Sequence, residues 1–220
     1  MRAPESNPFC TRFTRPGALR FAFPPECQAR DLVATLIMQD WWGQILGPHG
    51  SGKSTLLETL IPELTASGRA VIRYSLRGGQ RRLRDRSNSF RQWNRSTQVV
   101  VDGYEQLSLF QRWRLRSRCR RAGAGLLITA HRSMGLPDLF TTRVDLDVAR
   151  TVVHRLLDGY PAVITERDIR CCHRQQQGNL RETLFVLYDL YGQRRSQESV
   201  NPGYSSVSAM TALPRDETDE

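Results

Sequence analysis

The chain has 220 residues, which is enough for one sizeable hydrophobic core with a small appendage. Its apolar fraction of 39% is ordinary for a globular protein, and the lack of a ~20-residue apolar run or a secretory signal predicts a cytoplasmic protein without a membrane partner. The formal net charge of +10 comes from arginine, because Lys53 is the only lysine among 32 basic residues.

The first elements expected along the chain are an N-terminal extension, a helix and a short strand. Residues 1–25 contain proline and arginine, with a strand candidate at Leu19–Phe23. Apolar residues recur at helical spacing between Glu26 and Asp40. A short strand is then expected at Gly43–Leu46, followed by a glycine-rich loop.

The next expected element is a helix that begins at Lys53. Its apolar residues fall on one face at helical spacing: Leu56, Leu57, Leu60 and Leu64. Pro62 is expected to kink or shorten the last turn, and Gly68 is expected to end the helix.

Four further strands are expected, with helical segments between most of them. They are Ala70–Leu76, Gln98–Val101, Gly125–Ala130 and Arg143–Val148. Strands that alternate with helices predict an α/β fold, in which helices cover both faces of a parallel sheet. The second and third of the four are continuous apolar runs, typical of central strands, whereas the other two carry polar residues typical of edges. The pattern agrees with the strand order 5-1-4-3-2.

The character of the sequence changes after the last of these strands. Three helices are expected, at Ala149–Asp158, from a cap at Thr165 to about Gln176, and after a cap at Asn179. The last carries one apolar face: Leu180, Leu184, Leu187, Tyr188 and Tyr191. We therefore expect a core at 26–158, a small C-terminal helical lid at 159–195 and a disordered polar tail at 196–220.

The loop sequence GPHGSGKST fits the phosphate-loop pattern G-x-x-x-x-G-K-[ST], between an expected strand and an expected helix. The chain's only lysine stands at the position where the pattern requires a lysine. Glycines let the backbone curl so that its amides point inward at phosphates. The predicted nucleotide-binding residues are Gly47, Pro48, His49, Gly50, Ser51, Gly52, Lys53, Ser54 and Thr55. Lys53 would reach the β- and γ-phosphates of ATP, and Ser54 would ligate Mg²⁺.

A second motif, VVVDGYEQ, places Asp102 at the end of an apolar strand. Ligands of open α/β sheets lie at the carboxyl ends of the strands. Asp102 is therefore predicted to hold magnesium together with Ser54, although an aspartate before a glycine can also simply cap a turn.

These two motifs together resemble the P-loop ATPases of the additional-strand class. Many members carry a glutamate directly after the aspartate to polarise the attacking water, but Gly103 stands there in this chain. The DGYE arrangement resembles the D-G-x-[DE] version of NACHT- and STAND-type ATPases, which implies Glu105 as the base. The resemblance also implies that Thr129, or alternatively His131, contacts the γ-phosphate or the water.

A third motif, GNLRE at 178–182, resembles the lid helix of AAA+ proteins. In that family the arginine reaches the γ-phosphate, which implies this role for Arg181. A surface arginine on an amphipathic helix is the simpler alternative.

Two arginine-rich runs, at 77–95 and 112–121, contain Trp93 and Trp113. A basic surface with aromatic residues can bind nucleic acid through phosphate contacts and stacking. An acidic protein partner or a solvated helix face explains the same runs equally well.

Taken together, the motifs predict an ATP-binding protein that acts as a slow magnesium-dependent ATPase, in the role of a switch or an assembly subunit. A homo-oligomer is compatible with this function. The alternatives are a small-molecule P-loop kinase, or a nucleic-acid-binding adaptor that does not turn ATP over.

Overall fold

The computed structural model describes residues 7–76, 78–83 and 92–200, with the side chains of 198–200 excepted. The strands are β1 (Trp42–Leu46), β2 (Ala70–Ser75), β3 (Thr97–Asp102), β4 (Gly125–Ala130) and β5 (Asp138–Thr141). The helices are α1 (Thr11–Thr14), α2 (Ala29–Met38), α3 (Lys53–Ala66), α4 (Leu109–Ala122), α5 (Leu146–Leu157), α6 (Glu166–Gln175) and α7 (Leu180–Val200), and a 3-10 turn, η2 (Tyr104–Gln106), follows β3.

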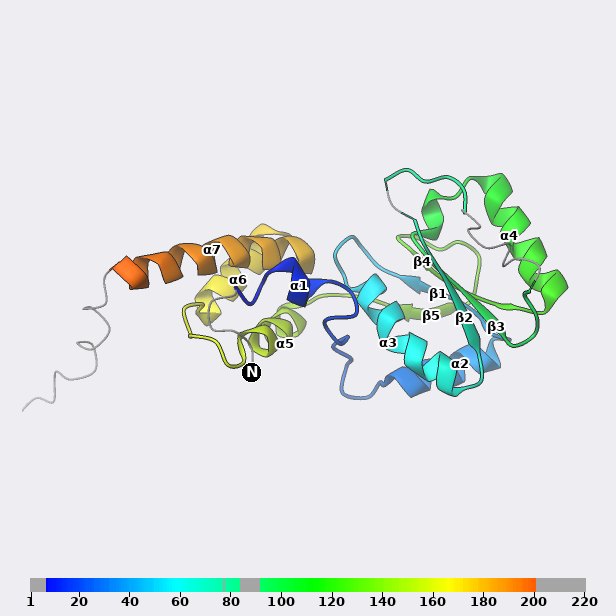
Figure 1. Cartoon of the computed structure of the whole chain (residues 1–220), viewed down its shortest axis with the longest axis horizontal. Coiled ribbons are helices and arrows are strands. Elements are labelled where there is room, and N and C mark those ends of the chain that lie inside the picture. The colour runs from blue at the N-terminus through cyan, green and yellow to red at the C-terminus, as the bar shows by residue number, and fades with distance from the viewer. Residues whose placement is uncertain (1–6, 77, 84–91, 201–220) are drawn as a thin grey trace, which may run out of the picture.

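The five strands form one parallel sheet in the order β2-β3-β4-β1-β5 (Figure 1). This confirms the strand order expected from the sequence. The two apolar runs are central: β4 is buried along its whole length, and β3 is buried except at Asp102. The edge strand β2 has exposed and half-buried residues throughout, which explains its polar positions.

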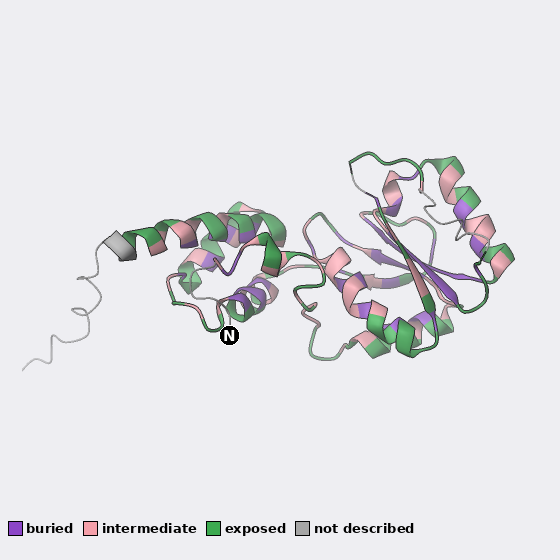
Figure 2. Ribbon diagram, viewed as in Figure 1, coloured by how far each residue is buried: buried purple, intermediate pink, exposed green. Residues whose placement is uncertain are grey.

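Alternate residues of the central strands face two separate cores, because side chains alternate across a sheet. One face packs against α2 and α3, where Val100 and Leu127 meet the leucines predicted for α3. The opposite face packs against α4, where Val99 and Val101 lie near Trp93. Figure 2 shows the buried strands between the helical layers. The core is therefore a three-layer α/β fold.

The fifth strand was placed wrongly by the sequence pattern. Arg143–Val148 is not a strand, and the fifth strand is Asp138–Thr141, which pairs with β1. The alternating residues belong to a cap and a first helical turn, because the carboxylate of Asp145 accepts a hydrogen bond from the amide of Val148 at 2.8 Å. A capped helix start and a short edge strand share this alternation over six residues.

The strand predicted at Leu19–Phe23 is also wrong, and its alternation has another cause. Phe21 and Phe23 pack against the sheet core, whereas Leu19 and Ala22 pack against the C-terminal helices. The amide of Phe21 donates to Thr59 Oγ1 at 3.2 Å rather than to a neighbouring strand. The segment lies between two lobes, so its two faces are buried in different places.

The helix α3 ends before Gly68 as predicted but is not shortened at Pro62, whereas α7 extends further than the sequence indicates. The helix α3 continues through Pro62 to Ala66, and Gly68 follows with φ +78°. The helix α7 continues to Val200, where a disordered tail was expected from Ser196. The hydroxyl of Ser196 donates to the carbonyl of Gly192, one turn earlier in this helix, at 3.0 Å. The remaining tail, 201–220, lies outside the described residues.

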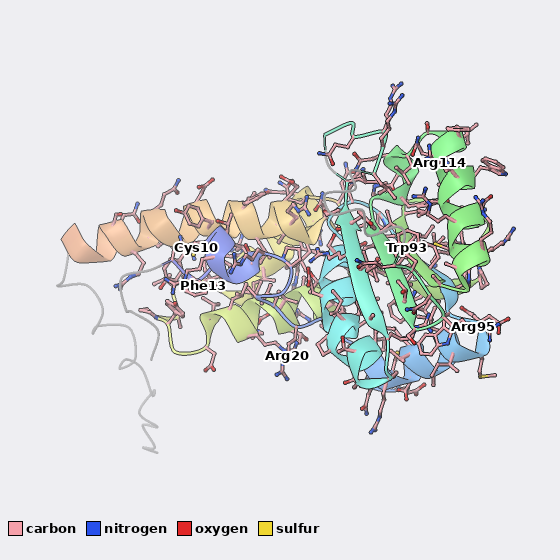
Figure 3. All side chains as sticks on the ribbon, turned by 45° about the vertical axis from the view of Figure 1, so that its right-hand side comes forward. Cys10, Phe13, Arg20, Trp93, Arg95 and Arg114 are labelled. Atoms are coloured by element: carbon pink, nitrogen blue, oxygen red, sulfur yellow. The ribbon has the colours of Figure 1, made fainter. Side chains whose placement is uncertain are left out.

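The helices α5, α6 and α7 form a second lobe with its own core, to the left in Figure 1. The N-terminal segment completes this core: Phe9 is 1% exposed and its ring lies 6.0 Å from that of Tyr191. Cys10 and Phe13 of the same segment lie beside these helices in Figure 3. The predicted capping box at Thr165 is present. Tyr188, predicted to face the core, is 42% exposed.

Within the described part of the chain, every helix is too short or too polar to span a bilayer.

Candidate functional site

The glycine-rich loop lies at the carboxyl end of β1 and leads directly into α3. Gly50 and Gly52 have φ values of +71° and +88°, in the left-handed region that favours glycine. Gly52 is the residue before the helix, so the first amides of α3 face the loop. The strand, loop and helix that the phosphate-binding pattern requires are therefore all present.

Lys53 lies inside this loop and is 9% exposed. Its ammonium donates to the carbonyl oxygens of Gly47 at 2.7 Å and Pro48 at 2.6 Å. Burial lowers the pKa of Lys53, while Glu105 and Asp102 raise it in part. A cation surrounded by loop carbonyls can turn to a phosphate without leaving the loop.

Ser54 and Asp102 meet at the mouth of the loop, although they are 48 residues apart in the sequence. The Ser54 hydroxyl donates to Asp102 Oδ2 at 2.7 Å. The Thr129 hydroxyl donates to Asp102 Oδ1 at 2.7 Å and accepts from the amide of Gly103 at 2.9 Å. A hydroxyl and a carboxylate are oxygen donors of the kind that Mg²⁺ prefers, so this pair fits the ion.

Glu105 lies beside the loop and contacts His131, which follows β4. Glu105 Oε1 is 3.0 Å from His131 Nε2, and Glu105 Oε2 is buried without a hydrogen-bond partner among the described residues. The other ring nitrogen, Nδ1, lies 3.0 Å from the carbonyl of Gly47 and 3.2 Å from Lys53 Nζ. One carboxylate oxygen is thus held by a histidine, and the other makes no hydrogen bond within the described part of the chain.

The rings of His131 and His49 lie against each other, with centroids 3.7 Å apart. Burial is the largest cause that lowers the pKa of His49, followed by the nearby His131 and Lys53. The sequence pattern proposed His131 as an alternative to Thr129, but both side chains are at the site. The stacking of His49 on His131 was not predicted, since no local signal marks contacts between residues so far apart in the sequence.

The GNLRE segment, which begins α7, lies against the loop. A Cβ atom placed on Gly50 would be 1.8 Å from Asn179 Oδ1, so the backbone of the loop and Asn179 are in direct contact. Arg181 lies near enough to lower the pKa of Lys53 and His49, as a minor contribution to each. The segment brings the helical lobe to the same site as the sheet.

Thr142 was missed as a residue of this site. Its Oγ1 is 2.6 Å from Ser51 Oγ and donates to the carbonyl of Leu46 at 3.1 Å, which supports the loop from the side of β5. A Cβ atom on Gly47 would lie 2.1 Å from the same Oγ1. Thr142 directly follows β5. The sequence pattern placed the fifth strand at Arg143–Val148, so Thr142 was not recognised as a residue at the carboxyl end of a strand.

No family model and no curated protein matches the sequence. Solved structures match the fold. The replication initiator DnaA bound to AMPPCP and single-stranded DNA has a TM-score of 0.53 at 16% sequence identity, over 83% of this chain and 67% of that chain. AMPPCP-bound DnaA from Aquifex aeolicus has a TM-score of 0.46 at 14% identity, over 80% of this chain and 67% of that chain.

A chain of the E. coli MS115-1 HORMA:CdnC:Trip13 complex has a TM-score of 0.39 at 14% identity, over 69% of this chain and 64% of that chain. At such identities a likeness indicates the fold alone. The likeness to the first of these structures, together with the strand order, shows that this chain shares the fold of that replication initiator.

Proposed function

We propose that this protein binds ATP and Mg²⁺ at the glycine-rich loop and hydrolyses ATP slowly, as a switch or an assembly subunit. The observation that carries the proposal is the 2.7 Å contact between Ser54 and Asp102. It joins the phosphate-loop motif and the VVVDGYEQ motif, each of which contains a residue predicted to hold magnesium. The DnaA structure, which has the same fold, is bound to the nucleotide analogue AMPPCP. This supports the proposal that the present chain binds a nucleotide.

Nucleotide binding would use the loop amides and Lys53. The loop residues Gly47–Thr55 would surround the phosphates, and the Lys53 ammonium would turn from the carbonyls of Gly47 and Pro48 toward them. Ser54 and Asp102 would exchange their direct hydrogen bond for contacts to the ion. Magnesium, when bound, neutralises the charge that develops on the phosphates.

Hydrolysis would depend on Glu105 as the base that orients the attacking water. His131 holds Glu105 Oε1, which leaves Oε2 to accept the proton of the water. Thr129 would contact the γ-phosphate or the water from the end of β4. The position of β4 between β1 and β3 supports the proposed resemblance to the additional-strand class.

The helical lobe would act as a lid over the nucleotide. The predicted lid was 159–195 beside a core at 26–158, but this lobe also contains residues 7–22 and α5, which was expected in the core. Asn179 contacts the loop, and Arg181 follows it at the start of α7, so lid position and phosphate occupancy would be coupled. The partner would be a nucleic acid or an acidic protein that contacts the arginine-rich surface, and the protein could act as a homo-oligomer.

The test measures ATP binding and phosphate release with the full chain. Lys53→Ala is expected to weaken ATP binding at least ~100-fold, since it removes the charge inside the loop. Glu105→Gln is expected to keep binding and to lose turnover by ~100-fold or more. Arg170→Ala changes an exposed arginine of α6 outside the proposed site; it is the matched control and should change neither.

Two results would overturn the proposal. Unchanged ATP affinity in Lys53→Ala would remove the loop from nucleotide binding. Transfer of the γ-phosphate of ATP to a small-molecule acceptor would show that the protein is a kinase and not an ATP-hydrolysing switch.

A further inference from the structure

The helix α4 presents a basic and aromatic face to solvent. The first turns carry large exposed side chains: Leu109 is 79%, Phe110 61% and Trp113 64% exposed. The rings of Phe110 and Trp113 lie 6.1 Å apart and 30° from parallel. Six of the 14 residues of α4 are arginines and none is acidic. Arg114 projects from the outer side of this helix in Figure 3.

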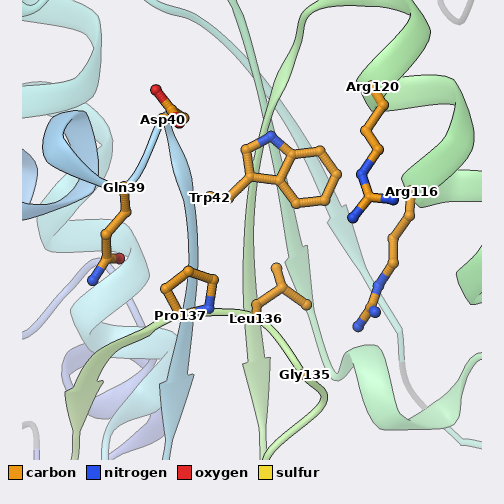
Figure 4. Close-up of a pocket in the computed structure, with 8 residues that line it drawn as sticks. All are labelled: Gln39, Asp40, Trp42, Arg116, Arg120, Gly135, Leu136 and Pro137. Atoms are coloured by element: carbon orange, nitrogen blue, oxygen red, sulfur yellow. The ribbon is translucent and has the colours of Figure 1, made fainter.

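This face leads into a pocket of about 320 Å³ at the end of the sheet where β1 begins, away from the glycine-rich loop. Figure 4 shows the indole of Trp42 with the guanidinium groups of Arg116 and Arg120 beside it. The Arg120 guanidinium lies 5.4 Å from the centre of the Trp42 ring. Gln39 and Asp40 place an amide and a carboxylate at the rim.

The two parts of this surface lie along one side of α4. Trp113 and Arg120 are seven residues apart, or two helical turns, so they project in the same direction about 10 Å from each other. Arg116 lies between them in the sequence and on the same side. The surface therefore runs from an exposed aromatic pair, past two arginines, to a second indole in a pocket.

The turn before Trp42 fixes the position of this second indole. Asp40 and Trp41 both have left-handed backbone conformations, with φ values of +52° and +67°, which are uncommon for residues other than glycine. The amide of Trp42 donates to the carbonyl of Gln39 at 2.9 Å within this turn. Strained backbone of this kind is retained where the surrounding structure requires one orientation.

Charge and shape together point to one class of ligand. A membrane-bound helix needs a continuous apolar side, but here the large exposed apolar residues stop after Trp113, and arginines follow on the exposed side. An acidic peptide would pair with the arginines but would leave the exposed aromatic rings and the Trp42 pocket unused. Single-stranded nucleic acid uses both, because its bases stack on aromatic rings and its phosphates pair with arginine.

We propose that the α4 surface defined by Phe110, Trp113, Arg116, Arg120 and the Trp42 pocket binds single-stranded nucleic acid. One base would stack on the Phe110–Trp113 pair, one would enter the pocket, and the intervening phosphates would contact the two arginines. The distance of about 10 Å between Trp113 and Arg120 along α4 corresponds to about three stacked nucleotides at 3.4 Å each. The proposal deepens the partner named in the proposed function, but it does not require ATP turnover.

The surface is connected to the glycine-rich loop site through the backbone next to Glu105. The Arg112 guanidinium donates to the carbonyl oxygen of Glu105, and the Arg116 Nε donates to Tyr104 Oη at 3.0 Å. Nucleic acid bound along α4 would therefore contact a helix that is bonded to the segment carrying the proposed base.

The experiment measures binding of dye-labelled oligodeoxythymidylate and oligouridylate to the full chain by fluorescence anisotropy, without nucleotide and at several salt concentrations. We expect Trp113→Ala to weaken binding about 5- to 100-fold. Arg120→Glu is expected to weaken binding and to reduce the salt dependence by about 0.7 in log Kd per log salt for the lost phosphate contact. A difference between the two oligonucleotides would identify DNA or RNA as the preferred ligand.

Matched controls lie on the helical lobe. Tyr188→Ala removes an aromatic ring that is 42% exposed, and Arg170→Glu makes the same charge change as Arg120→Glu. Both should leave oligonucleotide binding within about twofold. Thermal melting of every variant checks that the fold is kept.

Three results would overturn the proposal: no binding of either oligonucleotide at low salt, equal binding by Trp113→Ala and the native chain, or binding to vesicles of anionic phospholipid in place of oligonucleotides. Because the assay contains no ATP, its failure is distinguishable from failure of the proposed ATPase function.

Discussion

At the residue scale, the contact between His131 and Glu105 decides how the proposed base is oriented. One carboxylate oxygen is 3.0 Å from the ring, and the other has no hydrogen-bond partner among the described residues. A carboxylate with one anchored oxygen accepts a proton from one direction. In the proposed mechanism, His131 would therefore position Glu105 rather than act as a base itself.

His131→Ala is expected to lower kcat for ATP hydrolysis about 10- to 100-fold, because Glu105 loses its orientation. The KM for ATP should change much less, since the loop amides and Lys53 remain. Steady-state phosphate release measures both quantities. His154→Ala removes a similar histidine–glutamate contact, 2.6 Å from Glu166, on the helical lobe and should leave kcat unchanged. An unchanged kcat in His131→Ala would show that the orientation of the Glu105 carboxylate does not depend on His131.

A second prediction concerns Gly50, which has a left-handed backbone conformation and lies against the side chain of Asn179. Gly50→Ala places a Cβ where Asn179 Oδ1 lies and holds alanine at φ +71°. We expect a loss of about 2–3 kcal/mol in the free energy of unfolding, from the left-handed backbone and the displaced Asn179.

Gly68→Ala is the matched control for Gly50→Ala. Gly68 has φ +78° with nothing within 4 Å of an added Cβ, so its variant should lose only about 1 kcal/mol. Urea denaturation measures both. Adding Asn179→Gly to Gly50→Ala should recover part of the difference, and equal losses at the two glycines would contradict the contact between loop and lid.

Some residues of the candidate site belong to local sequence motifs and could be predicted, whereas others are brought to the site only by the fold. Lys53, Ser54 and Asp102 could be predicted because each belongs to a motif whose spacing is set by phosphate and metal geometry. Thr142 could not, because its contact with Ser51 forms only in the folded chain. His49 was predicted as a loop residue, but its contact with His131 could not be predicted for the same reason. Trp93 was grouped with Trp113 by the arginine-rich runs, but Trp93 is 6% exposed and belongs to the core. Of that first run, residues 77 and 84–91 lie outside the described part of the chain.

At the scale of elements, one ion pair joins α6 to α7 beside the apolar core that the two helices share. The Arg194 guanidinium donates to Asp168 at 2.6 Å and 2.9 Å, and to the carbonyl of Val163. Hydrogen bonds from Arg194, followed by those from Thr165, lower the pKa of Asp168 to about 2. Asp168 also closes the capping box of α6. The pair thus joins a helix start to the neighbouring helix.

Arg194→Gln is expected to reduce the free energy of unfolding by about 1–2 kcal/mol near neutral pH. The folded-state pKa of Asp168 is below its ordinary value of 3.8, so the pair stabilises the fold above about pH 4 and loses its effect as the pH falls toward 2. Urea denaturation of both chains at about pH 6 and about pH 2 measures this.

The difference between the native chain and Arg194→Gln should shrink at the lower pH. Arg174→Gln, an exposed arginine of the same helix as Asp168, serves as the control and should show no such dependence. A difference that stays constant with pH would assign the loss to packing of the arginine stem.

Element types were predicted well where a single physical cause produced the pattern. The strands β3 and β4 are apolar because they are buried on both faces, and Thr165 begins a helix because its capping box is local. The fifth strand was misplaced because its four residues, DLFT, carry no clear period. The true β5 is an edge strand specified by its pairing with β1 and by Leu139 in the core, which are tertiary features.

At the scale of the whole molecule, the helical lobe needs the N-terminal segment. Phe9→Ala is expected to destabilise this lobe by about 3 kcal/mol, because a 1% exposed ring is lost from its core. Hydrogen exchange measured by helix and strand should show a larger loss of protection in α6 and α7 than in β3 and β4.

Phe110→Ala is the matched control for Phe9→Ala. Phe110 is 61% exposed, so its loss should change stability by no more than about 0.5 kcal/mol. An equal loss of protection in both lobes of Phe9→Ala would show that the molecule unfolds as one cooperative unit.

The chain passes between the two lobes twice, once at Leu19–Phe23 and again between β5 and α5. Two bodies joined by one linker can swivel in any direction, whereas two bodies joined at two points bend easily about the line through those points. The second crossing is short and follows Thr142, which supports the loop. A lobe that opens and closes over a nucleotide would therefore move along one arc, with Asn179 and Arg181 returning to the same place on the loop in each cycle.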